Sequence, residues 1–302
     1  MQNNILVIIV TYNAMPWLER CMNSLRKSTV IPDVFVVDNG STDGTQSYIR
    51  ERYPDALFQQ SEENLGFGRA NNLGLQYALD HDYNYVYLLN QDAWVMPETL
   101  ERLIAFSKSQ PDYGILGPFQ MNDCQNHIDK HFIVQTLAWQ SNPDIMNDLY
   151  NQQLKEVYPV MEVMAAHWLM TRECIRKVGG FSPSFYHYGE DCNYIDRVHY
   201  WGLKVGVVPS LRVVHDREWR EDSPAKMMYM GYSSCIRLLS NPQERVWRAW
   251  LKVLLTETKQ AIVFRSLRPF RYLMKLIVDS RRVLKIKKAS IDRECAFLTL
   301  QV

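Results

Sequence analysis

The chain has 302 residues, 47% hydrophobic content and a net charge of +1, which suits a folded core in one large domain or two small ones. No stretch reaches the roughly 18 uncharged apolar residues of a membrane span, and the first residues lack the positive charge of a secretory signal, so a cytoplasmic location is expected. The six cysteines lie far apart without metal-type spacing, which favours free thiols.

Charge is divided unevenly along the chain. Residues 1–215 carry 16 Lys/Arg and 24 Asp/Glu, whereas residues 216–302 carry 18 Lys/Arg and 9 Asp/Glu. An acidic part followed by a basic part indicates two regions with different roles. We therefore predict one domain at residues 1–216 and a basic helical region at residues 217–302.

The first part alternates strand-like and helix-like segments. Ile5 to Val10 and Val34 to Asp38 are short apolar runs rich in β-branched residues, and each is followed by a helical pattern. Two strand–helix units in succession predict an α/β fold with a parallel sheet and right-handed crossovers. Further strands are predicted at residues 58–61, 85–89, 115–121, 160–171, 204–209 and 211–215. Further helices are predicted at residues 45–52, 97–108, 172–178 and 189–201, and a polar loop region at residues 122–160.

A glycine-rich segment follows the third predicted strand. Gly66 and Gly68 allow a ligand to approach the backbone closely, and Arg69 places a permanent cation at the start of a helix. This combination suits an anion such as a diphosphate. A simple turn with a surface arginine explains the same residues equally well.

Single acidic residues stand at the ends of predicted elements. Asp92 follows the apolar run that ends at Leu89, at the edge of an α/β sheet where ligands bind, although it could also cap the helix near Pro97. Glu190 and Asp191 begin a helix, where the macrodipole favours their ionised form and where capping is the simpler explanation.

Several polar stretches occur in a distinctive order. They are Val10 to Asn13, Val37 to Gly44, Asn64 to Asn72, Asn90 to Asp92, Gly179 to Phe181, Gly189 to Asp191 and the late His215. In this order and spacing they resemble the inverting nucleotide-sugar glycosyltransferases of family 2, over about residues 5–216. The resemblance implies the GT-A fold, a nucleotide-binding mixed sheet flanked by helices, here with a C-terminal helical extension.

The resemblance also assigns roles within the donor site. Asp38 is expected to bond a uracil or thymine ring, with Thr11 and Tyr12 packed beside the base. Asp92 and His215 are expected to bind Mg²⁺ or Mn²⁺ together with diphosphate oxygens, because hard cations favour oxygen-rich sites. A lone histidine at the end of an apolar segment is otherwise a common core residue. The remaining expected nucleotide-sugar contacts are Asn13, Asn64, Gly66, Arg69 and Asn90.

Asn90 departs from the usual D-x-D motif of the family. Its amide can accept a hydrogen bond from a ribose hydroxyl but supplies no charge, so weaker metal binding is expected. The N-x-D form is similar to that of rhamnosyltransferase-like members that make bacterial surface polysaccharides. This similarity favours dTDP-rhamnose over a UDP-sugar as the donor.

The resemblance predicts a single in-line displacement. An acceptor hydroxyl attacks the anomeric carbon, and Asp191 removes its proton, a contribution of roughly 10²–10⁴ in rate. Glu190, His167 and Trp168 are expected to line the pocket for the sugar and the acceptor. For Trp168, burial in the core is an equally good hypothesis.

The basic region has helical periodicity from Glu244 onward, with an interruption expected at Pro269. Its alternating cations and apolar residues are typical of helices that bind anionic membrane surfaces, which would hold the enzyme at the inner face of the cell membrane near a glycan or lipid-linked acceptor. A helical subdomain packed on the sheet, or an oligomer contact, is an equal alternative. No recognition motif supports nucleic-acid binding.

Two other functions remain open from the sequence. A catalytically silent nucleotide-sugar-binding or scaffolding protein at the membrane surface is conceivable because of Asn90. A nucleotidyltransferase on a similar sheet is less favoured, since a second metal carboxylate and a more basic phosphate loop are not visible.

Overall fold

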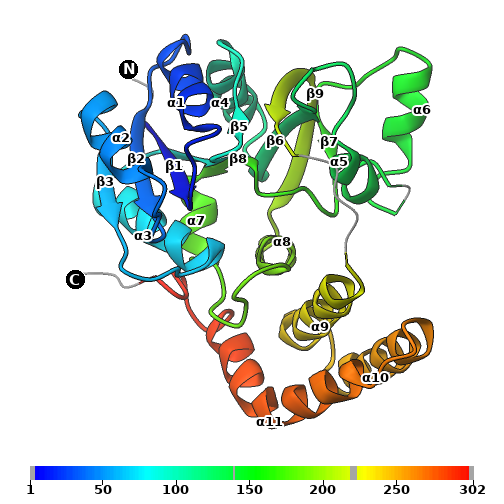
Figure 1. The fold of residues 1–302 in the computed structure, drawn as a ribbon. Coiled ribbons are helices and arrows are strands. Elements are labelled where there is room, and N and C mark those ends of the chain that lie inside the picture. The colour runs from blue at the N-terminus through cyan, green and yellow to red at the C-terminus, as the bar shows by residue number, and fades with distance from the viewer. Residues whose placement is uncertain (1–3, 139, 218–222, 299–302) are drawn as a thin grey trace.

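The strands form one mixed sheet in the computed structural model, which describes residues 4–138, 140–217 and 223–298 (Figure 1). The strand order is β3-β2-β1-β4-β8-β6-β9-β5, with β7 also paired to β9. Strands β1 to β4 are parallel to one another, whereas β8 is antiparallel to both β4 and β6. The strands are β1 (Ile5–Thr11), β2 (Asp33–Asp38), β3 (Leu57–Gln60), β4 (Tyr85–Asn90), β5 (Ala93–Trp94), β6 (Tyr113–Met121), β7 (Tyr158–Pro159), β8 (His167–Thr171) and β9 (Lys204–His215).

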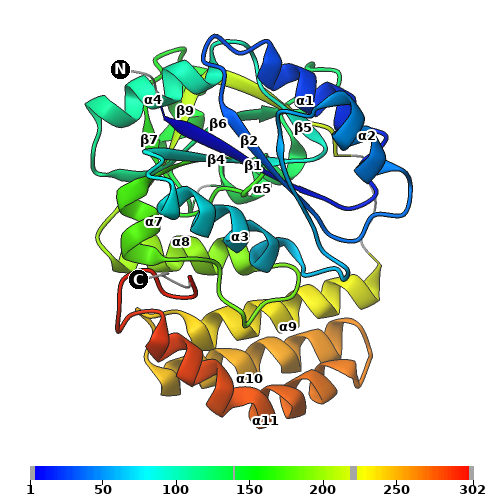
Figure 2. The same cartoon turned by 90° about the vertical axis from the view of Figure 1, so that its left-hand side faces the viewer.

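Helices cover both faces of the sheet, and three more form an outer layer. Figure 2 shows α1, α2 and α4 on one side of the sheet, α3, α7 and α8 on the other, and α9 to α11 beyond them. The helices are α1 (Leu18–Arg26), α2 (Thr45–Arg52), α3 (Phe67–Asp80), α4 (Thr99–Ser109), α5 (Lys130–Gln135), α6 (Asp144–Tyr150), α7 (Arg172–Val178), α8 (Glu190–Tyr200), α9 (Pro224–Ser240), α10 (Val246–Val263) and α11 (Arg268–Ala289).

Strand β1 explains why the sheet needs helices on both faces. Its side chains alternate between two apolar cores, because successive residues of a strand point to opposite faces. Leu6 and Ile8 pack in the core shared with α3, α7 and α8, whereas Val7 and Ile9 pack in the core shared with α1, α2 and α4. A parallel strand buried on both sides is continuously apolar, as β1 is.

The carboxyl ends of three central strands meet at one edge of the sheet. Thr11 at the end of β1 pairs with Asp38 at the end of β2, and Val10 pairs with Asn90 at the end of β4. Ligands of open α/β sheets bind at this edge. The fold therefore gathers the polar residues that follow each strand.

Three sequence predictions about the elements need correction. The region 122–160, predicted as a loop, contains α5 and α6, and the strand predicted at 160–171 covers only His167–Thr171. The two strands predicted on either side of Ser210 are one strand, β9, whose pairing with β6 skips from Val208 to Arg212. This irregularity accommodates Pro209, which has no N–H to donate within a sheet.

Helices α9 to α11 have a small apolar core of their own around Tyr232, Leu239 and Leu276. Arg237 of α9 attaches this layer to the sheet domain, because it donates to both carboxylate oxygens of Asp196 in α8 at 2.7 Å. The chain then returns to the first domain, where Cys295 N donates to the carbonyl of Arg176 at 2.7 Å. The break between α10 and α11 falls at residues 264–267, just before Pro269.

Candidate active site

Asp92 and His215 lie side by side at the sheet edge. Ala93 of β5 pairs with His215 at the end of β9, so Asp92 is held next to the imidazole, with 3.5 Å between Oδ1 of Asp92 and Nε2 of His215. His215 is buried, and its Nδ1 lies 3.3 Å from Oε1 of Gln120. An imidazole that donates from Nδ1 leaves the Nε2 lone pair available, and Nε2 makes no hydrogen bond with any described residue.

This pair fits a divalent cation. Burial alone would raise the pKa of Asp92, but the imidazole of His215 and the guanidinium of Arg217 outweigh it and lower that pKa. An ionised carboxylate beside a buried, unpartnered imidazole nitrogen is a suitable donor set for Mg²⁺ or Mn²⁺. Among the described residues no group of three His, Cys, Asp or Glu side chains forms a metal cluster.

Asp191 and Glu190 reach the same site from helix α8. Gly189 has φ +85°, and the helix begins at Glu190 directly after it. Both carboxylates line a cavity of about 540 Å³ that is also lined by Asn90 and Asp92. The structure therefore brings Asp92, His215 and Asp191 together from three distant parts of the chain.

Glu190 and Asp191 differ in environment. Glu190 is only 7% exposed, and burial, followed by the charge of Asp191, raises its pKa to about 8. Its Oε2 accepts no hydrogen bond within the described part of the chain. Glu190 is therefore neutral at pH 7, and it lies next to the carboxylate of Asp191 in the first turn of α8.

Comparison with known proteins identifies the family. The model of "Glycosyl transferase family 2" matches residues 6–179, which is more than half of the chain. The chain belongs to glycosyl transferase family 2. Because the match ends at residue 179, the positions of Asp191 and His215 in this glycosyltransferase rest on the geometry above.

Two kinds of relative support the family and the fold. The N-acetylglucosaminyl-diphospho-decaprenol L-rhamnosyltransferase of Mycobacterium tuberculosis is 28% identical over 271 residues, which cover 82% of this chain and 87% of the relative. The S. aureus TarS structure in complex with UDP-GlcNAc matches with a TM-score of 0.56 at 16% identity, covering 96% of this chain and 90% of TarS. The mannosyltransferase PcManGT from Pyrobaculum calidifontis, in complex with GDP-Man and Mn²⁺, matches with a TM-score of 0.52 at 19% identity, covering 95% of this chain and 73% of PcManGT. The predicted rhamnosyltransferase-like GT-A fold with C-terminal helices is confirmed.

Asp38 takes part in a local hydrogen-bond network after β2, and its contact with a base stays a prediction. It is completely buried, and its two oxygens accept from the hydroxyls of Thr11 and Ser41, the backbone N–H of Ser41 and the amide of Gln46. Four donors fill the lone-pair positions of a carboxylate. Asp38 therefore organises the turn after β2, and Thr11, equally buried, serves this turn.

Tyr12 and Asn13 extend from the same edge. Tyr12 is 50% exposed, and its backbone N–H and C=O both bond the side chain of Gln91, at 2.7 and 3.2 Å. Asn13 has φ +51°, and its side chain accepts from Thr42 N at 2.9 Å. Gln91 thus holds Tyr12 beside the motif that carries Asp92, a link that sequence reasoning missed.

The glycine-rich segment packs against protein where a ligand was predicted. A Cβ on Gly66 would lie 2.4 Å from the carbonyl oxygen of Tyr186, so this glycine is required by close backbone packing. Asn64 accepts from Gly66 N at 2.9 Å in a local turn. Arg69 lies 3.3 Å from Glu63 on the surface and is not among the described residues lining the cavity, so the interpretation as a surface arginine fits better.

Trp168 and His167 are core residues, contrary to the predicted pocket role. Trp168 is fully buried and stacks on Phe181 with 6.2 Å between ring centroids. His167 donates from Nε2 to Val214 O at 3.0 Å, and its Nδ1 accepts from the hydroxyl of Tyr87 at 2.9 Å. Burial, then the nearby His215, lowers the pKa of His167 to about 3, so a neutral His167 supports β9 behind the site.

The cavity also contains residues that the sequence analysis did not select. Trp17 lies just before α1, and Asp216 and Arg217 directly follow His215. His187, shortly before α8, and Lys226, in the first turn of α9, also line the cavity. Arg217 could have been selected from the sequence, because it lies two residues after the predicted metal ligand His215. Lys226 could not have been selected in this way, because α9 was not predicted.

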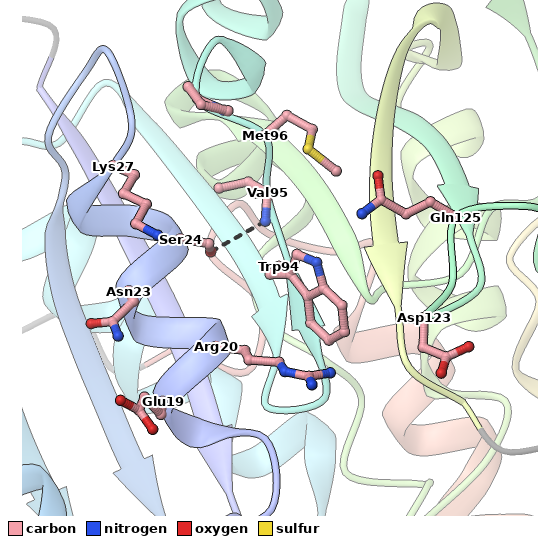
Figure 3. Close-up of a pocket in the computed structure, with 11 residues that line it drawn as sticks. Glu19, Arg20, Asn23, Ser24, Lys27, Trp94, Val95, Met96, Asp123 and Gln125 are labelled. Carbon is pink, nitrogen blue, oxygen red and sulfur yellow. Dashed lines mark hydrogen bonds between the residues drawn. The ribbon is translucent and has the colours of Figure 1, made fainter.

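A second hollow, of about 640 Å³, lies between α1 and β5. Figure 3 shows Arg20 next to Trp94, with 5.6 Å from the guanidinium carbon to the ring centroid, and Ser24 bonded to the backbone N–H of Val95. None of the predicted site residues lines this hollow. The convergent carboxylates favour the other cavity as the site of the chemistry.

Proposed function

We propose that this family 2 glycosyltransferase is an inverting enzyme that moves a sugar from a nucleoside diphosphate to an acceptor hydroxyl. One observation carries the proposal: Asp191 and Asp92 line the same cavity, and His215 lies 3.5 Å from Asp92. A base and a leaving-group site on the two sides of a sugar are what a single displacement requires.

The donor and acceptor follow from the relatives. The mycobacterial relative is by name a rhamnosyltransferase acting on an N-acetylglucosaminyl-diphospho-lipid, and TarS was solved with UDP-GlcNAc. We infer dTDP-rhamnose as the donor, with a UDP-sugar as the alternative, and a lipid-linked glycan as the acceptor. The reaction would belong to the synthesis of a bacterial cell-surface polysaccharide.

The reaction balances as one step. The acceptor oxygen forms a bond to the anomeric carbon while the bond from that carbon to the diphosphate oxygen breaks. Asp191 takes the acceptor's proton, and the nucleoside diphosphate departs with the electron pair. Attack on the face opposite the leaving group inverts the configuration, and the neutral Glu190 can donate a hydrogen bond to an acceptor hydroxyl.

Asp92 and His215 would hold the divalent cation, and Asn90 would contact the nucleotide sugar. When bound, Mg²⁺ or Mn²⁺ stabilises negative charge that develops on the departing diphosphate. Arg217 also lines the cavity, and its guanidinium contributes to lowering the pKa of Asp92. It therefore adds a permanent positive charge on the donor side. The residue set therefore concentrates cationic groups on the donor side and the base on the acceptor side.

A nucleotide screen tests the proposal. With Mn²⁺ present, dTDP-rhamnose should raise the melting temperature, because a ligand that binds only the folded state stabilises it. Incubation with the donor and a GlcNAc-diphospho-lipid should then release dTDP. Mn²⁺-dependent binding without turnover on any acceptor would instead indicate the silent binding protein.

The outer helices provide a surface for membrane attachment. No helix within the described residues is long and apolar enough to cross a bilayer. Large apolar side chains are nevertheless exposed on α10 and α11, including Leu255 at 72% and Val278 at 77%. Exposed cations surround them: Arg268, Arg271, Lys275, Arg281, Arg282, Lys285 and Lys288. We propose that this surface binds the anionic inner face of the cell membrane.

Vesicle sedimentation checks the attachment. The protein should sediment with phosphatidylglycerol vesicles at low salt and less so at high salt, since each cation near the surface adds about 1 kcal/mol. The double variant Leu255→Glu, Val278→Glu should reduce binding by about tenfold or more, because two exposed side chains lose their insertion into lipid. Ile31→Glu, at a residue 66% exposed on the sheet domain, is the matched control. Equal binding by all three proteins would refute this surface.

A further inference from the structure

The two basic side chains among the described lining residues, Arg217 and Lys226, lie in different parts of the cavity. Arg217 contributes to lowering the pKa of Asp92, and its Nη1 lies 3.6 Å from the sulfur of Met164. Lys226 lies beside the segment that leads to the base, because its Nζ is 5.5 Å from the ring centroid of Tyr188, three residues before Asp191. Arg217, two residues after His215, therefore belongs with the donor carboxylate, and Lys226 with the base.

Lys226 is positioned by two elements. It lies in the first turn of α9, where its backbone N–H bonds the N-cap hydroxyl of Ser223 at 3.2 Å. Its Nζ is 5.5 Å from the ring centroid of Tyr188, the residue directly before the turn that begins α8. Tyr188 has φ +66°, and its ring lies 4.0 Å from that of His187. We call His187, Tyr188 and Lys226 the α9 wall.

The α9 wall borders a cavity rich in acidic side chains. Asp92, Asp191 and Asp216 line the cavity together with the neutral Glu190. A second diphosphate beside that of the donor would need its own cation in this setting. Lys226 supplies that charge beside Tyr188, in the segment that leads to Asp191, where the acceptor hydroxyl must lie.

We propose that the α9 wall binds the diphosphate of the acceptor, with Lys226 as its principal cation. The proposal rests on the function proposed above and names how the acceptor is recognised. An acceptor sugar with its hydroxyl at Asp191 has its diphosphate one sugar ring away, on the side of the α9 wall. Helix α9 packs on α10 and α11, so the α9 wall and the surface proposed above to bind the membrane belong to one helical layer (Figure 2).

Two acceptors, one with and one without a diphosphate, distinguish binding of the diphosphate from binding of the sugar. With dTDP-rhamnose as donor, Lys226→Ala should raise KM for N-acetylglucosaminyl-diphospho-farnesol by about 10- to 100-fold, because a charged hydrogen bond is lost. KM for octyl N-acetylglucosaminide, which lacks phosphate, and KM for the donor should stay unchanged. Lys226→Arg should recover part of the loss, since it keeps the charge. Lys204→Ala, at the far end of β9 with Nζ 3.1 Å from Asp112, is the matched control.

A binding titration compares wild type with Lys226→Ala without requiring sugar transfer. Farnesyl diphosphate is titrated into protein saturated with dTDP and Mn²⁺, so that the donor site is filled. Weaker binding by Lys226→Ala supports the α9 wall even if no sugar is transferred, in which case only the proposed function fails. Equal binding by wild type and Lys226→Ala overturns the inference. So does an equal KM change for both acceptors, or a change confined to the donor, which would assign Lys226 to the donor phosphates.

Discussion

Replacing Asp191 by Asn is expected to lower kcat by about 10²- to 10⁴-fold, because the amide cannot accept the acceptor's proton. The side-chain shape is retained, and Asp191 belongs to α8, whereas Asp92 follows β4 and His215 ends β9. Nucleotide binding, measured as the rise in melting temperature with dTDP and Mn²⁺, should therefore be unchanged. The rate is measured with both substrates at saturation, so that kcat is separated from KM.

Glu190→Gln is the matched control for this variant. Glu190 has a pKa of about 8 and is neutral at pH 7, so an amide imitates its protonated form. The substitution should leave most of the activity at pH 7. In the wild type, Glu190 loses its proton as the pH rises through 8, which adds a negative charge beside Asp191, and the inflection that this produces in kcat/KM should be absent from Glu190→Gln. If Asp191→Asn keeps normal turnover, or if Glu190→Gln is the inactive variant, the base has been assigned to the wrong carboxylate.

Asp92→Ala should abolish the Mn²⁺-dependent part of nucleotide binding and lower kcat/KM by about 100-fold or more, since charge stabilisation by a metal is worth several kcal/mol. The physical reason is the small number of protein ligands: Asp92 is the carboxylate beside His215, and Asn90 adds no charge. The measurement is the Mn²⁺ concentration that gives half of the dTDP-induced rise in melting temperature.

Asp123→Asn is the control, because Asp123 is a carboxylate in the second hollow, outside the catalytic cavity. Its Mn²⁺ titration should match that of the wild type. A Mn²⁺ response that survives in Asp92→Ala would show that the cation binds elsewhere, and the N-x-D motif would then have no metal role in this glycosyltransferase.

Local sequence patterns were enough to predict most of the sheet and the identity of its polar edge. The strands that end at Thr11, Asp38 and Asn90 are short apolar runs, and the turn residues Pro16, Gly44 and Pro97 precede the helices after them. Helix α9 was missed even though Ser223 and Pro224 form a typical helix start. Its amphipathic pattern is as strong as that of α4, so the signal was present in the sequence.

The sequence by itself determined the family, the α/β class and the motif residues that meet at the sheet edge, because these depend on residue types and their spacing. Tertiary structure alone decided which residues face the cavity. Gly66 is required by the carbonyl of Tyr186, which is distant in sequence, and the carboxylate of Asp38 is filled by its own turn. Lys226 reaches the cavity only because α9 crosses beside α8. Contacts between remote segments determine which side chains are buried, and no local pattern encodes them.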